Sequence, residues 1–86
     1  MSAQGELAIV TGAGSGMGQA IAWSLAKEGY SVVGVGRSAE KLDDTARRSP
    51  APLEVLSLDV RNRDEVTRSL SSAISRLGTP KILVNN

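Results

Sequence analysis

The apolar residues of the chain gather in short runs, which alternate with longer segments of mixed polarity. Each run is brief and rich in aliphatic or β-branched residues, as is typical of buried strands. The runs are residues 7–10 (LAIV), 31–36 (SVVGVG), 53–60 (LEVLSLDV) and 81–85 (KILVN). The pattern therefore predicts four strands.

The first segment between strands has the periodicity of a helix. Met17, Ile21 and Leu25 recur at helical spacing, and Gly29 stands where a glycine would end the helix. Trp23 lies two positions from Ile21 and from Leu25. We therefore expect the indole at the border of the buried stripe, as a residue of the core margin.

Two further helices are predicted. The second begins at Ser38, whose side chain can cap it, and ends before Pro50. The third begins with Asn62 and Glu65, which resemble a capping box, and ends before Gly78. Its apolar face consists of Val66, Leu70, Ala73 and Leu77. The alternation of strands and helices predicts an α/β fold with a parallel sheet and right-handed crossovers.

A glycine-rich segment, TGAGSGMG at residues 11–18, joins the first strand to the first helix. Such a turn lets the backbone approach a ligand closely, and it directs the free N–H groups and the positive dipole end of the helix at that ligand. A phosphate group is the ligand that this arrangement favours. The alternative is a plain tight turn, for which glycines also serve.

The glycine spacing distinguishes between phosphate-binding motifs. A P-loop requires a lysine directly after its second glycine, whereas the first lysine here is Lys27. The strict GxGxxG dinucleotide fingerprint also fails, because Met17 or Gln19 occupies the position of the third glycine. The pattern that fits is TGxxxGxG, formed by Thr11, Gly12, Gly16 and Gly18.

Four motifs occur in a characteristic order: TGAGSGMG after the first strand, GRS after the second, LDV ending the third and VNN ending the fourth. With them the chain resembles, over essentially its whole length, the N-terminal part of a classical short-chain dehydrogenase/reductase. The resemblance implies one partial Rossmann domain over residues 1–86. It also implies a sheet of order 3-2-1-4, with a nicotinamide dinucleotide over the glycine-rich turn.

The resemblance further implies which residues contact the dinucleotide. Around the pyrophosphate and the adjoining ribose it places Gly12, Ser15, Gly16, Met17 and Gly18. Asp59 and Val60 would border the adenine, and Asn86 would lie near the cofactor at the end of the fourth strand. The alternative for Asp59 is a turn cap, and the alternative for Asn85 is an amide that only ties neighbouring strands together.

The end of the second strand bears on the choice of dinucleotide. An NAD site typically has an acid there, which binds the ribose 2′-hydroxyl. This chain has Arg37 and Ser38 at that point, and no acid between Glu28 and Glu40. We therefore expect NADP rather than NAD, with Arg37 and Ser38 holding the 2′-phosphate through charge-assisted hydrogen bonds. The alternative is that Arg37 is a solvated loop residue.

The resemblance places the catalytic residues outside this chain. The family's acid–base pair is Tyr-x-x-x-Lys with a nearby serine, in the half that follows the fourth strand. The single tyrosine here is Tyr30, and the residue four positions later is Gly34. We expect the NADP(H)-binding portion of an oxidoreductase that is inactive by itself. The alternatives are a non-catalytic dinucleotide-binding or protein-docking module, and a truncated product without function.

Composition narrows the remaining classes. The chain has 86 residues, a net charge of +1, and neither cysteine nor histidine. We therefore expect no nucleic-acid partner and no thiolate or imidazole metal site. The N-terminus has no basic leader and its apolar run is too short to span a membrane, so we expect a cytoplasmic chain of one unit. The fourth strand, as an apolar sheet edge, is expected to favour homo-oligomers or a covering partner.

Overall fold

The computed structural model describes residues 5–59 and 61–86, which form four strands and three helices in alternation. In chain order the elements are β1 (Leu7–Thr11), α1 (Gly16–Lys27), β2 (Ser31–Gly36), α2 (Ala39–Arg48), β3 (Glu54–Ser57), α3 (Arg63–Leu77) and β4 (Pro80–Val84). The α/β class and the element order predicted from the sequence are confirmed.

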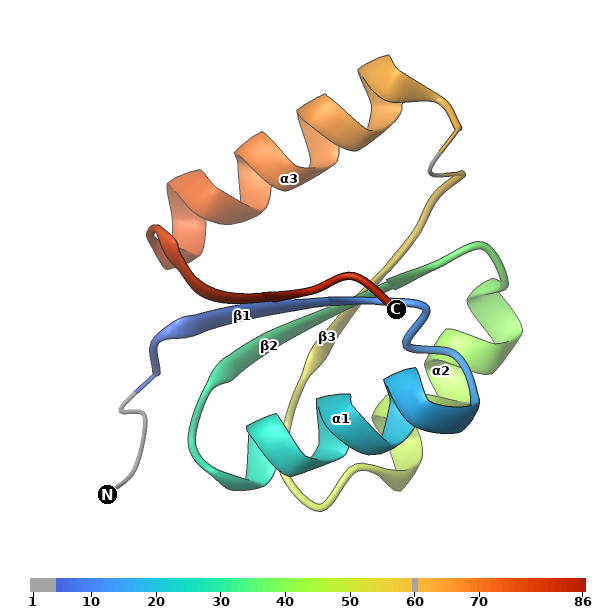
Figure 1. The fold of residues 1–86 in the computed structure, drawn as a ribbon, viewed down its shortest axis with the longest axis vertical. Coiled ribbons are helices and arrows are strands. Elements are labelled where there is room, and N and C mark those ends of the chain that lie inside the picture. The colour runs from blue at the N-terminus through green and yellow to red at the C-terminus, as the bar shows by residue number, and fades with distance from the viewer. Residues whose placement is uncertain (1–4, 60) are drawn as a thin grey trace.

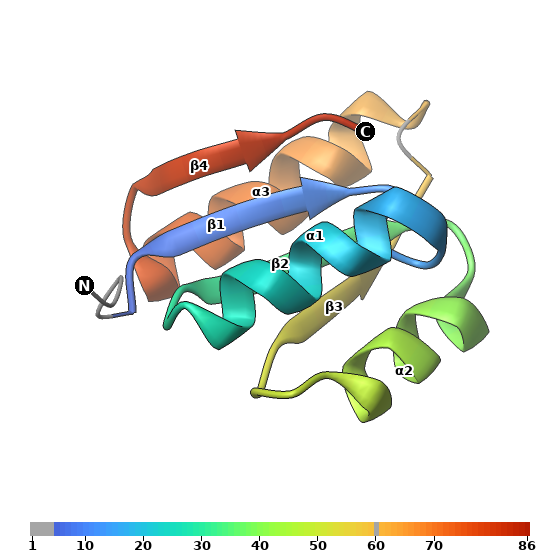
Figure 2. The same cartoon turned by 60° about the horizontal axis from the view of Figure 1, so that its bottom comes forward.

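The sheet has the strand order β3-β2-β1-β4, and every neighbouring pair is parallel. In the centre, Ile9 of β1 pairs with Val33 of β2 on one side and with Leu83 of β4 on the other. Because all four strands run the same way, their carboxyl ends meet at one edge of the sheet (Figure 2). The strand order is the one that the sequence predicted.

The helices lie on both faces of the sheet. α1 and α2 cover one face, and α3 covers the other (Figure 1). Strand side chains alternate between these faces. Val10 and Val32 belong to the core beneath α1 and α2, whereas Ile9 and Val33 belong to the core beneath α3. Because both faces of β1 and β2 are covered, the interiors of these strands lack polar side chains.

Helix α1 packs through small residues, which the sequence pattern did not reveal. Its buried positions are Gly18, Ala22 and Ala26, whereas Met17 is 71% exposed. A Cβ at Gly18 would overlap the carbonyl oxygen of Gly12, so the first turn of α1 lies directly against the glycine-rich turn. Of the predicted stripe, Ile21 and Leu25 are partly buried and pack against the core, whereas Met17 is exposed.

The starts of α2 and α3 agree with the predicted caps. The side chain of Ser38 accepts a hydrogen bond from the Lys41 N–H at 3.2 Å, and that of Asn62 accepts one from the Glu65 N–H at 3.1 Å. The predicted apolar face of α3 packs on the sheet, with Ala73 fully buried. Local sequence signals therefore determine where both helices begin.

Strand β3 is shorter than the predicted strand over residues 53–60. It pairs with residues 33–36 of β2, so the end of β2 limits its length. One more backbone bond follows, from the Leu58 N–H to the Gly36 carbonyl at 2.8 Å, and the chain then turns at Asp59. The apolar residues beyond the ladder serve the core rather than the sheet, since Leu58 is buried.

Strand β4 lies at one edge of the sheet, as predicted, and its Leu83 is 66% exposed. It covers Pro80–Val84 rather than the predicted residues 81–85, and beyond its end the Asn85 side chain accepts a hydrogen bond from the Thr11 hydroxyl. Among the helices in the described ranges, none has both the length and the apolar character needed to cross a bilayer.

Candidate functional site

A cleft of about 410 Å³ opens at the edge of the sheet where the strands end. Its lining comes from the glycine-rich turn after β1, from the end of β2 with the start of α2, and from the residues that follow β4. Among the sequence-predicted site residues, the lining includes Gly12, Ser15, Arg37, Ser38 and Asn86. Segments separated by more than 70 positions in the chain thus meet around one space.

The glycine-rich turn has a conformation that depends on its glycines. Gly12 and Gly16 have φ angles of 66° and 58°, in the left-handed region that side chains disfavour. Between them, the N–H of buried Ala13 donates to the Val35 carbonyl at 3.1 Å, which fixes the turn to β2. A Cβ at Gly16 would meet open space within the described residues, so the backbone is accessible to a ligand there.

The N-terminus of α1 adjoins this turn and the cleft. Ser15 occupies the N-cap position in extended conformation, but its side chain makes no capping bond to any described residue. The first N–H groups of a helix lack intrahelical partners and carry partial positive charge. Gly18 lies buried against the turn, and Met17 lies exposed beside it. A helix start of this kind can accept an anion.

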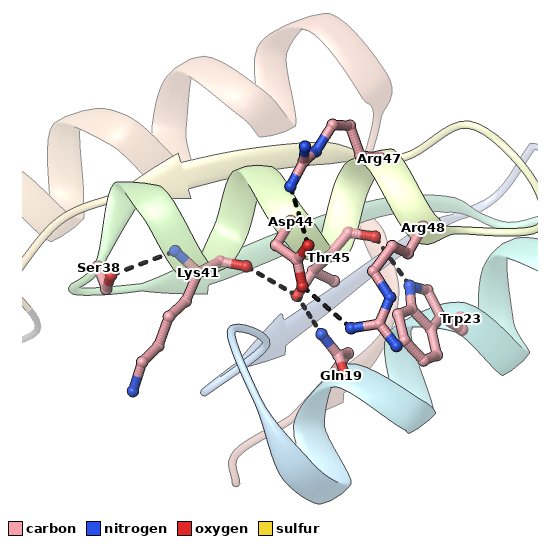
Figure 3. Close-up of polar contacts among 8 residues, drawn as sticks. All are labelled: Gln19, Trp23, Ser38, Lys41, Asp44, Thr45, Arg47 and Arg48. Atoms are coloured by element: carbon pink, nitrogen blue, oxygen red, sulfur yellow. Dashed lines mark hydrogen bonds and ion pairs between the residues drawn. The ribbon is translucent and has the colours of Figure 1, made fainter.

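The start of α2 contributes polar side chains on the other side of the cleft. Arg37 is exposed. The Ser38 side-chain oxygen caps α2 by accepting from the Lys41 N–H (Figure 3), which leaves the hydroxyl hydrogen able to donate. Lys41 also lines the cleft, and a Cβ at Gly14 would lie 3.1 Å from the Lys41 Cβ. Two cations and a hydroxyl therefore face the space beside the glycine-rich turn.

Sequence reasoning missed Lys41. The signal was available, because Lys41 follows the predicted N-cap Ser38 by three positions and so lies in the first turn of α2. A residue in that turn is at the same end of the sheet as the glycine-rich segment. The charge of Lys41 alone gave no reason to single it out from the other basic residues of the chain.

Asp59 lies in the turn that follows β3. Its carboxylate accepts hydrogen bonds from the Arg61 backbone N–H at 2.9 Å and from the Arg61 guanidinium at 2.9–3.2 Å. The side-chain hydrogen bond with Arg61 is the main reason why the pKa of Asp59 is far below its usual value, and the charge of Arg37 contributes. Asp59 thus caps a turn, and its adenine contact stays a prediction. Val60 lies outside the described residues.

The residues after β4 are tied to the end of β1. The Asn86 N–H donates to the Thr11 hydroxyl oxygen at 3.0 Å, and that hydroxyl lies 3.2 Å from the Asn85 side-chain oxygen. The Asn86 side-chain nitrogen would lie 3.0 Å from a Cβ at Gly12. Asn85 therefore links neighbouring strands, as the alternative interpretation held, while Asn86 lies against the glycine-rich turn.

Two kinds of chemistry find no support in the described part of the chain. No three aspartate, glutamate, histidine or cysteine side chains in residues 5–59 and 61–86 are grouped to bind a metal. Tyr30 directly precedes β2, so it lies at the opposite edge of the sheet from the cleft. The cleft lining instead includes Arg37, Ser38 and Lys41, side chains of the kinds that can bind phosphate.

A parallel sheet of order 3-2-1-4, with a glycine-rich turn leading into a helix at the point where the strand order reverses, defines a Rossmann-like fold. A family model described as short chain dehydrogenase matches residues 6–86. The chain belongs to the short-chain dehydrogenase family.

Individual relatives agree with this assignment. The chain is 42% identical to 3-oxoacyl-(acyl-carrier-protein) reductase FabG of Pseudomonas aeruginosa, covering 100% of this chain and 36% of that protein. Its fold matches the citronellol catabolism dehydrogenase AtuB of Pseudomonas aeruginosa with a TM-score of 0.90 and 35% identity, over 100% of this chain and 38% of that one. A metagenomic short-chain oxidoreductase in complex with NADP matches with a TM-score of 0.90 and 32% identity, over 96% and 39% of the respective chains.

The length of the match limits what these relatives establish. The chain spans about a third of the length of the curated relatives that it matches, which are 35% covered in one case and 36% in another. The family and the Rossmann-like fold extend over the matched part.

Proposed function

We propose that this chain is the NADP(H)-binding portion of a short-chain oxidoreductase. The observation that carries the proposal is the convergence of Arg37, Ser38 and Lys41 on the cleft formed beside the glycine-rich turn. The metagenomic relative with the same fold was solved in complex with NADP, which supports this choice of ligand.

The glycine-rich turn fits a pyrophosphate. The backbone at Gly16 is open to the outside, and the start of α1 presents N–H groups without a side-chain cap from the described residues. Two phosphates placed there would accept hydrogen bonds from these N–H groups and interact favourably with the helix dipole. We propose that Gly12, Ser15 and Gly18 shape this site and that Met17 adjoins the ribose.

The start of α2 fits a third phosphate, on the 2′-oxygen of the adenosine ribose. Arg37 and Lys41 supply positive charge, and Ser38 supplies a hydroxyl donor. A hydrogen bond to a charged group contributes about 1.5–3 kcal/mol, which favours NADPH over NADH by roughly ten- to a hundredfold. Glu40 lies in the same helical turn, but no atom of it lines the described cleft.

The adenine would lie between the ends of β2 and β3. The Ser57 hydroxyl donates to the Arg37 carbonyl at 3.0 Å, which holds these two strand ends together. Asp59 lies two residues after Ser57, and the charge of Arg37 makes a small contribution to lowering the pKa of Asp59. We propose that Asp59 and Val60 border the adenine. We propose that Asn86, after β4, lies near the cofactor on the side of the cleft away from the adenine.

We do not propose that this chain transfers hydride by itself. The bound dinucleotide would supply the hydride, while the residues of this chain bind and orient it. The tyrosine of the chain lies at the wrong edge of the sheet to protonate a substrate. We propose that the substrate-binding and acid–base groups belong to the remaining part of a complete enzyme.

A calorimetric titration tests the proposal. NADPH is expected to bind the chain with micromolar affinity. NADH is expected to bind at least about tenfold more weakly, because it has no 2′-phosphate to form charge-assisted hydrogen bonds. Adenosine 2′,5′-bisphosphate serves as a control, because it has the 2′-phosphate without the pyrophosphate and should compete weakly. A folded chain that binds neither dinucleotide would refute the proposal.

A further inference from the structure

Thr45 of α2 is a polar residue in the apolar core. It is 0% exposed, whereas the other fully buried side chains of comparable size, such as Leu42 and Val10, are aliphatic. It lies eight residues after Arg37, the residue that follows β2, and 32 residues after Ala13. A buried hydroxyl requires hydrogen-bond partners, and those partners show what Thr45 connects.

The Thr45 hydroxyl joins three segments at one atom. Its oxygen lies 2.9 Å from the Ala13 carbonyl in the glycine-rich turn and 3.1 Å from the Lys41 carbonyl one turn earlier in α2. The Gln19 side chain of α1 donates to the same oxygen at 2.9 Å, and Figure 3 shows this side chain reaching up from α1 toward α2. One hydroxyl thus links the turn, α1 and α2.

Further contacts hold Thr45 from the far side. The Trp23 indole N–H donates to the Thr45 carbonyl at 2.8 Å, and the Arg48 guanidinium lies 5.3 Å from the centre of the indole ring (Figure 3). Trp23 is half-buried, at the border of the α1 face as the sequence predicted. Arg48 is in turn paired with Asp44 at 3.1 Å. These contacts restrict how α2 can move over α1.

Ala13 is the point at which the glycine-rich turn is held. Its N–H donates a hydrogen bond to the Val35 carbonyl of β2, and its carbonyl accepts one from the Thr45 hydroxyl. A Cβ at Gly34 would lie 2.9 Å from the Ala13 Cβ, so Ala13 lies directly over the sheet. The sheet therefore holds the peptide group before Ala13, and α2 holds the peptide group after it.

We propose that Thr45 is a positioning residue that sets the relation between the glycine-rich turn and the start of α2. The inference rests on the proposed function, which places the pyrophosphate at the glycine-rich turn and the 2′-phosphate at the start of α2. A dinucleotide that carries a 2′-phosphate contacts both segments, so it binds well only when their spacing is fixed. NADH depends chiefly on the glycine-rich turn.

The test compares Thr45→Val with Thr45→Ser in the full chain. Valine keeps the shape of the side chain and removes the hydroxyl, whereas serine keeps the hydroxyl. Thr45→Val is expected to weaken NADPH binding about tenfold and NADH binding less, which lowers the selectivity. Thr45→Ser is expected to keep the parent ratio of the two dissociation constants. An unchanged ratio in Thr45→Val would overturn the inference.

Amide hydrogen exchange provides a measurement that needs no ligand. In Thr45→Val, exchange at the Ala13 N–H is expected to quicken by at least about tenfold relative to exchange at Ile9 in β1. The matched control is Val33→Ala, which weakens the core on the α3 face and should accelerate both amides together. Equal acceleration of both amides in Thr45→Val would show ordinary loss of stability and contradict the positioning role.

The two measurements separate the failure of each proposal. A parent chain that binds neither dinucleotide refutes the proposed function, and the exchange rates still decide whether Thr45 holds the turn. If Thr45→Val does not fold, Gln19→Leu removes one bond to the same hydroxyl from the surface of α1. That variant is expected to lower the NADPH selectivity in the same direction, and an unchanged selectivity would contradict the inference.

Discussion

Helices α1 and α3 both begin at the edge of the sheet where the strands end, yet their N-termini differ. Asn62 caps α3, and the acids Asp64 and Glu65 lie in its first turn. At α1 the N-cap Ser15 makes no side-chain capping bond within the described ranges, and the first turn is Gly16–Gly18. Thus α3 has a side-chain cap and negative charges at its N-terminus. The first N–H groups of α1 have neither, so they remain able to bind a ligand.

The difference shows what folding alone requires of a helix start. A side-chain cap stabilises a helix by about 1 kcal/mol. The lack of such a cap at α1 therefore does not contribute to the stability of the fold. If a bound phosphate takes the role of the cap, the two helix starts should respond oppositely to substitution. Changes at α1 should alter binding, whereas changes at α3 should alter stability.

The largest effect is expected for Gly16→Val in α1. A β-branched residue is strained at a φ of 58°, and its side chain would occupy the open space over the turn, so NADPH binding should be abolished. The matched variant is Arg63→Val, which places the same side chain at the first position of α3 and should leave binding intact. Titration of both folded variants checks this, and parent affinity in Gly16→Val would remove the phosphate-binding role of the turn.

The start of α2 is an intermediate case, because it is capped by Ser38 and also faces the cleft. Arg37→Ala is expected to weaken NADPH binding by about ten- to a hundredfold and to leave NADH binding nearly unchanged. Lys41→Ala should act in the same direction with a smaller effect. Arg47→Ala, at the far end of α2 and paired with Asp44, is the control. Equal losses for both dinucleotides would argue against a 2′-phosphate site.

The sequence predicted the elements of the fold well, because their signals are local. Ser38 and Asn62 cap the helices that they were expected to cap, and Gly29 has the left-handed φ of 101° that ends α1. The length of β3 was overestimated, since pairing with β2 limits it and apolar residues continue past the ladder. Pairing partners are not visible in one strand's own sequence.

The site was predicted in part, and the missing part depends on tertiary contacts. Arg37, which lines the cleft, was predicted because the end of a strand is the expected place for such a residue, whereas Thr45 looks in the sequence like an ordinary polar residue of a helix. Its partners Gln19 and Ala13 are 26 and 32 positions away. Which face of α1 is buried likewise follows from the contact of Gly18 with the glycine-rich turn, and periodicity alone favoured Met17.

The cap residues themselves allow a direct test of the comparison. Asn62→Ala removes the bond to the Glu65 N–H and should lower the free energy of unfolding by about 1 kcal/mol without changing NADPH binding. Ser15→Ala should change the free energy of unfolding by less than about 0.5 kcal/mol, because its hydroxyl makes no cap among the described residues. It should nevertheless weaken NADPH binding. Urea unfolding measures the free energy of unfolding, and titration measures NADPH affinity. Weaker NADPH binding in Asn62→Ala, or unchanged NADPH binding in Ser15→Ala, would refute the contrast between the two helix starts.

The smallest effect concerns the far end of α3, where Arg76 pairs with Glu54 of β3 at 3.1 Å. The hydrogen bond from Arg76 lowers the pKa of Glu54 below its usual 4.5, so the pair stabilises the folded chain above pH 4.5 and loses this effect as the pH falls through the lowered pKa. Both side chains are about half exposed, which keeps the contribution small. Arg76→Ala should therefore lower the melting temperature slightly at pH 7, and the difference from the parent should vanish in acid. A difference that persists at low pH would mean that Arg76 supports α3 through packing rather than through its charge.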